Sequence, residues 1–173
     1  MSAASSPPRK AAVSLGSNEG DRMAHLRAAL AWCEAVAEGP VRASTVYETD
    51  PVGCAPGTPP FLNAAVVFEV RGEARALFAA MRAFERRRGR PASYPRNAPR
   101  PLDMDLLLFG DVRLDRGEVL LPHPRMYSRA FVLRPLCELE PAWVPVGADR
   151  TLKDFLDSLP VSGDVRRWKE TLR

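Results

Sequence analysis

Residues 96–109 have the sequence RNAPRPLDMDLLLF, and their second half predicts a β-strand. Side chains alternate between the two faces of a strand, so Asp103 and Asp105 would project from one face while Leu102 and Met104 point into a core. Two carboxylates this close repel each other unless a cation lies between them. Magnesium is commonly held by one or two carboxylates, with phosphate oxygens and water completing its coordination. The pair therefore predicts a Mg²⁺ site at the start of this strand.

Arginines are concentrated immediately before this carboxylate pair. Seven lie between residues 82 and 100, at positions 82, 86, 87, 88, 90, 96 and 100. A guanidinium group matches the geometry of phosphate oxygens and can bind two of them at once. We expect Arg86 and Arg87 to be solvated at a helix end, and Arg90, Arg96 and Arg100 to serve the site because they lie nearer the carboxylates. Metal-binding carboxylates beside phosphate-binding arginines indicate phosphoryl transfer.

The composition is that of an ordinary globular protein, with 173 residues, 46% hydrophobic and 27% charged. This length favours a single domain, which we place at residues 10–173 after a disordered tail at residues 1–9. Three widely spaced cysteines match no zinc or redox pattern, which favours a reducing compartment. No segment has the roughly 18 apolar residues of a membrane helix, and the N-terminus lacks the apolar core of a signal peptide. We therefore expect a cytoplasmic protein without membrane contact.

Hydrophobic periodicity predicts the order of the secondary-structure elements. Strands are expected at residues 11–15, 41–49, 61–70 and 102–109, with helices at about 22–38 and 73–88. Shorter helices are expected at residues 131–139 and 152–159. The core order βαββαβ predicts an α+β, ferredoxin-like sandwich, in which two helices pack on one face of a four-stranded antiparallel sheet. The later residues would form a C-terminal extension.

Four segments, in this order, resemble the hydroxymethyl-dihydropterin pyrophosphokinase family of folate biosynthesis. They are residues 14–18, residues 47–53 with 60–65, residues 96–107, and residues 121–126 with Arg129, Phe131 and Leu133. The Arg-x-x-Asp-x-Asp element alone would be a weak match, since paired aspartates occur in many unrelated proteins. Four motifs in the right order make the resemblance specific, and together they fall within residues 11–140.

The resemblance implies an enzyme with the ferredoxin-like fold and two magnesium ions. Such an enzyme transfers the terminal pyrophosphoryl group of ATP to the hydroxymethyl group of 6-hydroxymethyl-7,8-dihydropterin, leaving AMP. The resemblance implies that Asp103 and Asp105 bind both metal ions. It also implies that Arg90 and Arg100 are catalytic arginines that bind the phosphates. Further ATP contacts are implied for Glu85, Arg96, His123 and Arg129, with Glu85 at the ribose.

The same resemblance assigns the dihydropterin to a flat slot. Aromatic side chains bind flat heterocycles well, and Phe61 and Phe131 resemble the two sandwiching positions. Asn63 resembles the amide that hydrogen-bonds the pterin edge, while Thr49 and Val52 offer backbone groups nearby. Small molecules are thus the expected partners, and we expect a monomer.

Two other interpretations stay open at this point. The net charge of +4 and a pI near 9.3 would also fit a ferredoxin-like nucleic-acid-binding module with aromatic residues that stack on bases. Paired aspartates on the exposed face disfavour it, because they repel phosphates without a metal, so we expect no nucleic acid. A regulatory nucleotide binder without catalysis is disfavoured by the intact carboxylate pair.

Overall fold

The computed structural model describes residues 7–51, 54–91, 93, 98–161 and 164–173. The strands are β1 (Arg9–Ser17), β2 (Arg42–Ala43), β3 (Tyr47–Thr49), β4 (Phe61–Val70), β5 (Asp103–Phe109) and β6 (Val165–Arg167). The helices are α1 (Arg22–Val36), α2 (Ala74–Arg87), α3 (Ala130–Leu139) and α4 (Leu152–Asp157), with a short 3-10 turn, η1 (Met126–Ser128). β1 begins at Arg9, one residue inside the segment expected as a tail.

These strands form one antiparallel sheet with the neighbour order β5, β1, β4, β3, β6, and β2 pairs with β4 beside β3. The α+β class with an antiparallel sheet is therefore confirmed. The expected sheet of four strands is corrected to one of six, because residues 41–49 form two strands and β6 was not predicted. A side chain explains the split: the Ser44 hydroxyl accepts the Ala65 N–H at 2.9 Å, which replaces one main-chain bond of the ladder.

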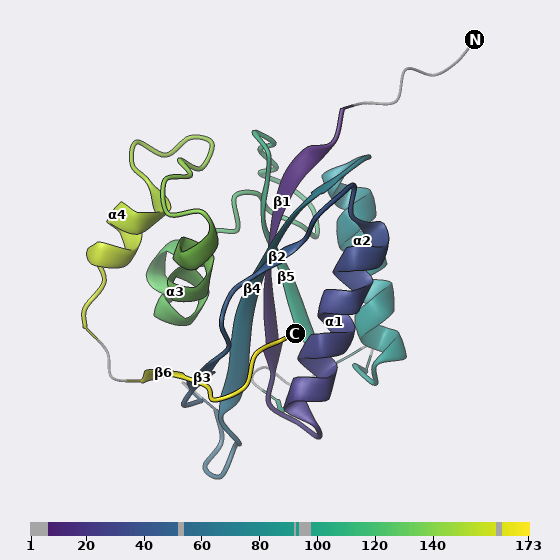
Figure 1. Cartoon of the computed structure of the whole chain (residues 1–173), viewed down its shortest axis with the longest axis vertical. Coiled ribbons are helices and arrows are strands. Elements are labelled where there is room, and N and C mark those ends of the chain that lie inside the picture. The colour runs from purple at the N-terminus through teal and green to yellow at the C-terminus, as the bar shows by residue number, and fades with distance from the viewer. Residues whose placement is uncertain (1–6, 52–53, 92, 94–97, 162–163) are drawn as a thin grey trace.

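Helices cover both faces of the sheet, with α1 and α2 on one side and α3 and α4 on the other (Figure 1). Beneath α1 and α2 lies a core that includes Val13, Leu15, Leu62 and Met104. A second core packs Ala12, Ala65 and Val67 against α3. Alternate residues of β1 and β4 thus serve opposite cores, as the period of two requires.

Local signals account for the helix limits. The Asp21 carboxylate accepts the Ala24 N–H at 2.9 Å and caps the start of α1. Gly89, with φ of 97°, follows the end of α2 as expected from its sequence. Thr151 and Asp154 form a capping box at α4, which ends at Asp157 rather than at residue 159.

Two further expectations concern the environment of the chain. Within the described residues, no helix has the length and apolar character needed to cross a membrane. Cys33 and Cys137 are buried thiols, and burial raises their pKa values to about 12 and about 11. Both are therefore unreactive at neutral pH, as structural cysteines are.

Candidate functional site

Polar residues meet on the α3 side of the sheet, at the end of β1 and the beginning of β5. The register places Asn63 of β4, Gly16 of β1 and Asp103 of β5 side by side, and Ser14 opposes Asp105. Directly opposed residues project from the same face, so the two aspartates share this face with Asn63. Their side chains are 23% and 28% exposed, while the intervening Met104 is fully buried. The predicted orientation of the pair is confirmed.

Three arginines surround the carboxylate pair. Arg90 Nη1 lies 2.7 Å from one Asp103 oxygen, and Arg100 Nη1 lies 3.1 Å from the other. Arg82 Nη2 lies 3.4 Å from Asp105 Oδ1. The structure thus brings Arg90 and Arg100 to the pair as expected. Arg82 was counted among the arginines before the pair but not assigned to the site.

Glu85 of α2 binds two of these arginines, Arg82 and Arg90. Its carboxylate accepts the Arg82 guanidinium at 2.5 Å, Arg90 at 2.7 Å and the Met104 N–H at 2.6 Å. The residue has no exposed surface, and burial raises its pKa despite the neighbouring arginines. The expected contact of Glu85 with the ribose of ATP stays a prediction, and in the structure its carboxylate is bonded to groups within the protein. It ties the edge strand β5 to α2 and orients Arg82 and Arg90.

The surroundings of Asp105 disfavour its negative charge. Burial, and then the negative charge of Asp103, raise the pKa of Asp105 to about 6, although Arg82, Arg129 and Arg90 oppose the shift. A divalent cation would relieve this repulsion. No cluster of three or more metal-binding side chains occurs among the described residues. Two carboxylates with room for other ligands suit Mg²⁺, which keeps water and phosphate in its shell.

Asn18 connects the arginine loop to the end of β1. Its side-chain oxygen accepts the Arg100 N–H at 2.8 Å, and its own N–H donates to the Arg100 carbonyl at 3.2 Å. It is 1% exposed, and its amide donates to the Pro59 carbonyl at 3.5 Å. Asn18 lies in the first motif but received no predicted role. These three bonds attach the backbone at Pro59 and at Arg100 to the residue that follows the end of β1.

His123 and Arg129 lie between β5 and α3. The His123 N–H donates to the Leu107 carbonyl at 2.9 Å, which attaches this segment to β5. Burial, and then the charges of Arg129 and Arg125, lower the pKa of His123 to about 4. The Arg129 guanidinium lies over the Phe131 ring, 5.5 Å from its centroid. The charge of Arg129 lowers the pKa of Asp105, and the charge of Asp103 acts to raise the pKa of His123, so both predicted ATP residues lie within electrostatic reach of the carboxylate pair.

Three of the residues expected to bind the pterin lie on neighbouring strands: Thr49 on β3, and Phe61 and Asn63 on β4. The Asn63 amide donates to the Thr49 hydroxyl at 2.8 Å, and both residues are buried. Phe61 lies two residues before Asn63 and therefore on the same face, and it is half-buried, as is Phe131. The backbone contact expected for Thr49 stays a prediction, and the structure adds that its hydroxyl accepts the Asn63 amide. Val52 and Arg96 lie outside the described residues, so their predicted roles stay predictions.

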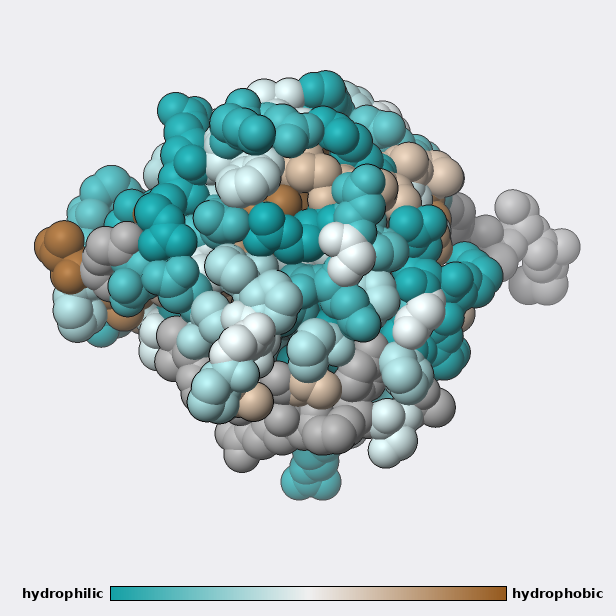
Figure 2. Space-filling view, turned by 90° about the horizontal axis from the view of Figure 1, so that it is seen from below, coloured by the Kyte–Doolittle hydropathy of each residue, from teal (hydrophilic) through white to brown (hydrophobic). Residues whose placement is uncertain are grey.

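The open surface at this end of the molecule is largely hydrophilic (Figure 2). Beneath this surface, Gly16 of β1 is buried and places no side chain between Asn63 and Asp103. A Cβ atom at this position would lie 3.6 Å from Asn63 Oδ1 and 3.8 Å from Asp103 Cβ. These are ordinary van der Waals distances, so the glycine leaves only the space of a methyl group between the buried amide and the first aspartate.

Comparisons with known proteins identify the family of this chain. The model of the 7,8-dihydro-6-hydroxymethylpterin-pyrophosphokinase (HPPK) family matches residues 12–141. A 2-amino-4-hydroxy-6-hydroxymethyldihydropteridine pyrophosphokinase of Bacillus subtilis is 40% identical over 159 residues, which cover 91% of this chain and 89% of the relative. A protein of the same name from Pseudomonas aeruginosa is 37% identical over 89% of this chain and 94% of the relative.

In some longer relatives, the segment similar to this chain makes up less than half of the protein. The mitochondrial folate synthesis bifunctional protein of Arabidopsis thaliana is 39% identical over 127 residues, and the match spans 23% of that protein. Among solved structures, an HPPK-DHPS in complex with substrates superposes with a TM-score of 0.74 at 12% identity, over 94% of this chain and 47% of that chain. The structural likeness at this identity shows a shared fold.

Proposed function

The chain belongs to the 7,8-dihydro-6-hydroxymethylpterin-pyrophosphokinase family, and we propose that it transfers a pyrophosphoryl group from ATP to 6-hydroxymethyl-7,8-dihydropterin. The hydroxymethyl oxygen forms a bond to the β-phosphorus of ATP. The bond from that phosphorus to the α,β-bridging oxygen breaks, and AMP leaves. The product is the dihydropterin diphosphate, formed in a step of folate biosynthesis. The observation that carries this proposal is the carboxylate pair with three arginines beside a buried Asn63–Thr49 pair.

Asp103 and Asp105 would hold the two Mg²⁺ ions that the reaction uses. Bound magnesium supplies positive charge to the phosphate oxygens and favours ionisation of the attacking hydroxyl. Both aspartates are partly exposed on one face of an edge strand, so their oxygens are accessible to such ions. Full ionisation of Asp105 is favoured once positive charge is close.

On this proposal, the arginines beside the carboxylate pair exchange their bonds to the carboxylates for bonds to the phosphates of ATP. Arg82, Arg90 and Arg100 bind the carboxylates in the present structure. The triphosphate of ATP offers competing oxygens with a higher charge, and Arg side chains stabilise charge that develops on a transferring phosphoryl group. Glu85 keeps Arg82 and Arg90 in place throughout, because its own bonds to them lie within the protein. Arg96 and Arg129 add positive charge along the nucleotide.

His123 would act as a neutral hydrogen-bond donor to ATP. Its pKa of about 4 keeps the ring uncharged at neutral pH. Its Nδ1 accepts the Arg125 N–H at 3.2 Å, so the proton resides on Nε2. That nitrogen can donate to a phosphate oxygen without a change of protonation.

The pterin would enter between Phe61 and Phe131. The Asn63 amide nitrogen already donates to Thr49, which leaves the Asn63 carbonyl oxygen to accept an N–H from the pterin edge. Gly16 leaves room beside that oxygen. A slot here would direct the hydroxymethyl group toward Asp103, which follows Asn63 and Gly16 in the same row of the sheet.

Product analysis tests the proposal directly. The protein is incubated with ATP and Mg²⁺, with and without 6-hydroxymethyl-7,8-dihydropterin, and the nucleotides are separated by chromatography. AMP that forms only with the pterin supports the proposal. ADP would instead identify an ordinary kinase, and AMP formed without pterin would identify a hydrolase. A salt-sensitive RNA complex without Mg²⁺ would favour the nucleic-acid-binding alternative.

A further inference from the structure

One carboxylate near the C-terminal end of α3 attaches this helix to the chain around β3. Glu138 Oε2 accepts the Thr45 N–H at 2.9 Å, and Oε1 accepts the Thr45 hydroxyl at 2.6 Å. Oε1 also accepts the Tyr47 hydroxyl. Three donors from residues 45–47 thus bond to one carboxylate. We call this set of three hydrogen bonds the Glu138 tie. The reaction derived above uses none of these groups.

The Glu138 tie joins the two elements that would enclose the pterin. Tyr47 lies directly opposite Asn63 in the sheet and two residues before Thr49, so all three project from the same face. Phe131 lies seven residues before Glu138, and residues seven apart lie on the same side of a helix. Neither Phe131 nor Glu138 belongs to the buried face of α3. The tie therefore connects the flank of α3 that carries Phe131 to the strand that carries Thr49.

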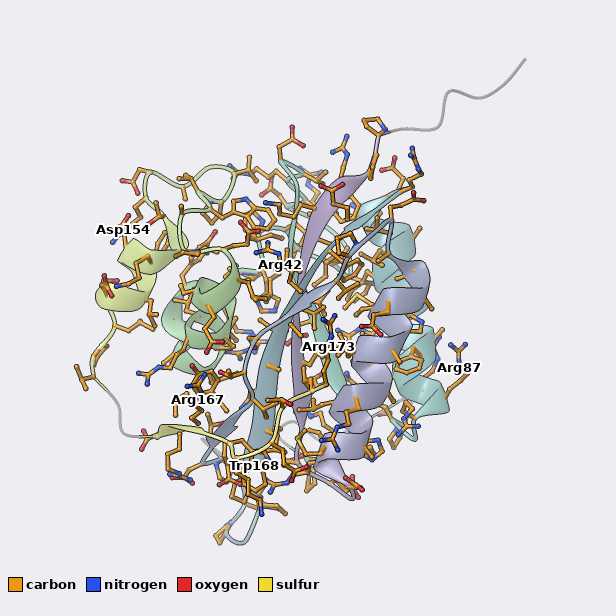
Figure 3. The ribbon with its side chains drawn as sticks, viewed as in Figure 1. Arg42, Arg87, Asp154, Arg167, Trp168 and Arg173 are labelled. Atoms are coloured by element: carbon orange, nitrogen blue, oxygen red, sulfur yellow. The ribbon has the colours of Figure 1, made fainter. Side chains whose placement is uncertain are left out.

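The charges around the tie keep its donors and acceptor in defined states. Burial acts to raise the pKa of Glu138, but the bonds from Thr45 and Tyr47, with the charge of Arg167, lower it overall. Burial and the bond to Glu138 raise the pKa of Tyr47. Arg167 opposes Tyr47 in β6 and lies below α3 in Figure 3. At neutral pH the carboxylate is ionised and the phenol is protonated, so the contact is a charge-assisted hydrogen bond.

We propose that Glu138 is a positioning residue for the pterin, because it sets the separation between Phe131 on α3 and the Thr49–Asn63 pair on the sheet. This inference rests on the function proposed above. A planar ring held between two side chains requires a gap of one ring thickness, and small errors in position weaken binding strongly. ATP contacts, which lie on β5, α2 and the segment before α3, do not depend on this gap.

Glu140 provides a matched control on the same helix end. Its carboxylate accepts Lys10 of β1 at 3.1 Å and also binds Arg42 of β2. These partners lie toward the other end of the sheet from Thr49 and Asn63. Loss of Glu140 would thus weaken the attachment of α3 without changing the contact beside the pterin.

The experiment compares Michaelis constants for both substrates in four variants: Glu138→Ala, Glu138→Gln, Tyr47→Phe and Glu140→Ala. We expect Glu138→Ala and Tyr47→Phe to raise KM for the dihydropterin about fivefold, the effect of losing ~1 kcal/mol of a hydrogen bond. KM for ATP should stay within about twofold. Glu138→Gln, which keeps an acceptor for the two hydroxyls, should recover most of the loss. Because the two groups form one contact, a fifth variant that combines Tyr47→Phe with Glu138→Ala should have nearly the same KM for the dihydropterin as Glu138→Ala alone.

Two results would overturn the inference. One is an equal rise of both Michaelis constants in Glu138→Ala, and the other is a Glu140→Ala variant with the same loss of pterin affinity. Thermal melts of all variants identify any common loss of folded protein. If the unmodified protein forms no AMP at all, the proposed function fails and this inference with it. If that protein is active and Glu138→Ala is indistinguishable from it, only this inference fails.

Discussion

The two faces of the central sheet are built from alternate residues of the same strands, yet where β1 ends and β5 begins one face is apolar and the other is polar. The face beneath α1 and α2 is apolar and buried at Val13, Leu15, Leu62 and Met104. The opposite face carries the residues of the site at the same level, namely Ser14, Gly16, Asn63, Asp103 and Asp105. Of two neighbouring residues in these strands, one therefore packs in the hydrophobic core and the other belongs to the candidate site.

The largest expected effect comes from removing either aspartate. Asp103→Ala or Asp105→Ala should lower turnover at least about a thousandfold, because the metal and phosphate charges lose their main protein ligand. The fold should persist, since both side chains are partly exposed. AMP formation measures the first effect and circular dichroism the second. Substantial residual activity would refute the assigned metal role.

Met104 lies between the two aspartates and points to the other face. Met104→Ala should destabilise the protein by about 2–5 kcal/mol, because it removes a fully buried side chain from the core. The activity per folded molecule should stay within about threefold of the unmodified protein. Urea unfolding gives the stability, and AMP formation at low temperature gives the activity. A stable but inactive Met104→Ala would break the separation of the two faces.

Arg82 and Arg87 on α2 test how far the site extends beyond the sheet. Arg82→Ala should reduce kcat/KM about a hundredfold, the usual cost of one lost donor to a developing charge. Arg87, the matched control, is exposed and projects outward from α2 (Figure 3). Arg87→Ala should change kcat/KM less than twofold. Equal effects of the two changes would show that α2 contributes only general positive charge.

The smallest expected effect is a pH-dependent gain in stability on removing the charge of Asp105. Its pKa is raised from an ordinary 3.8 to about 6. Between these values the folded state binds more protons than the unfolded one, so the contribution of this group to stability falls as pH rises through this window. Asp105→Asn should therefore raise Tm by about 2–4 °C at pH 8 without metal, and much less at pH 4.

Asp111→Asn is the control for this last measurement, because Asp111 is an exposed carboxylate at the other end of the sheet. Differential scanning calorimetry in a chelator measures both variants. A gain for Asp105→Asn that is the same at both pH values would mean that the pKa of Asp105 is not raised in the folded protein.

Local patterns predicted what depends on neighbouring residues alone. The alternation in residues 102–109 predicted the shared face of Asp103 and Asp105, and the apolar run at 61–70 predicted β4. The exposed positions of Arg86 and Arg87 also followed from their place at a helix end. The division of residues 41–49 did not follow, because it depends on a bond between the Ser44 hydroxyl and the backbone of a distant strand.

By itself, the sequence determined the main helices and the long strands, the orientation of the aspartates and the family, since alternation and motif spacing are properties of the chain. Only the tertiary structure decided that Glu85 is buried beneath Arg82 and Arg90, that Asn18 holds Arg100, and that β6 joins the edge of the sheet. The physical reason is that a side chain's partners depend on how helices and loops pack against the sheet. The sequence of a helix does not show whether a carboxylate on its surface contacts solvent or the edge of a neighbouring strand.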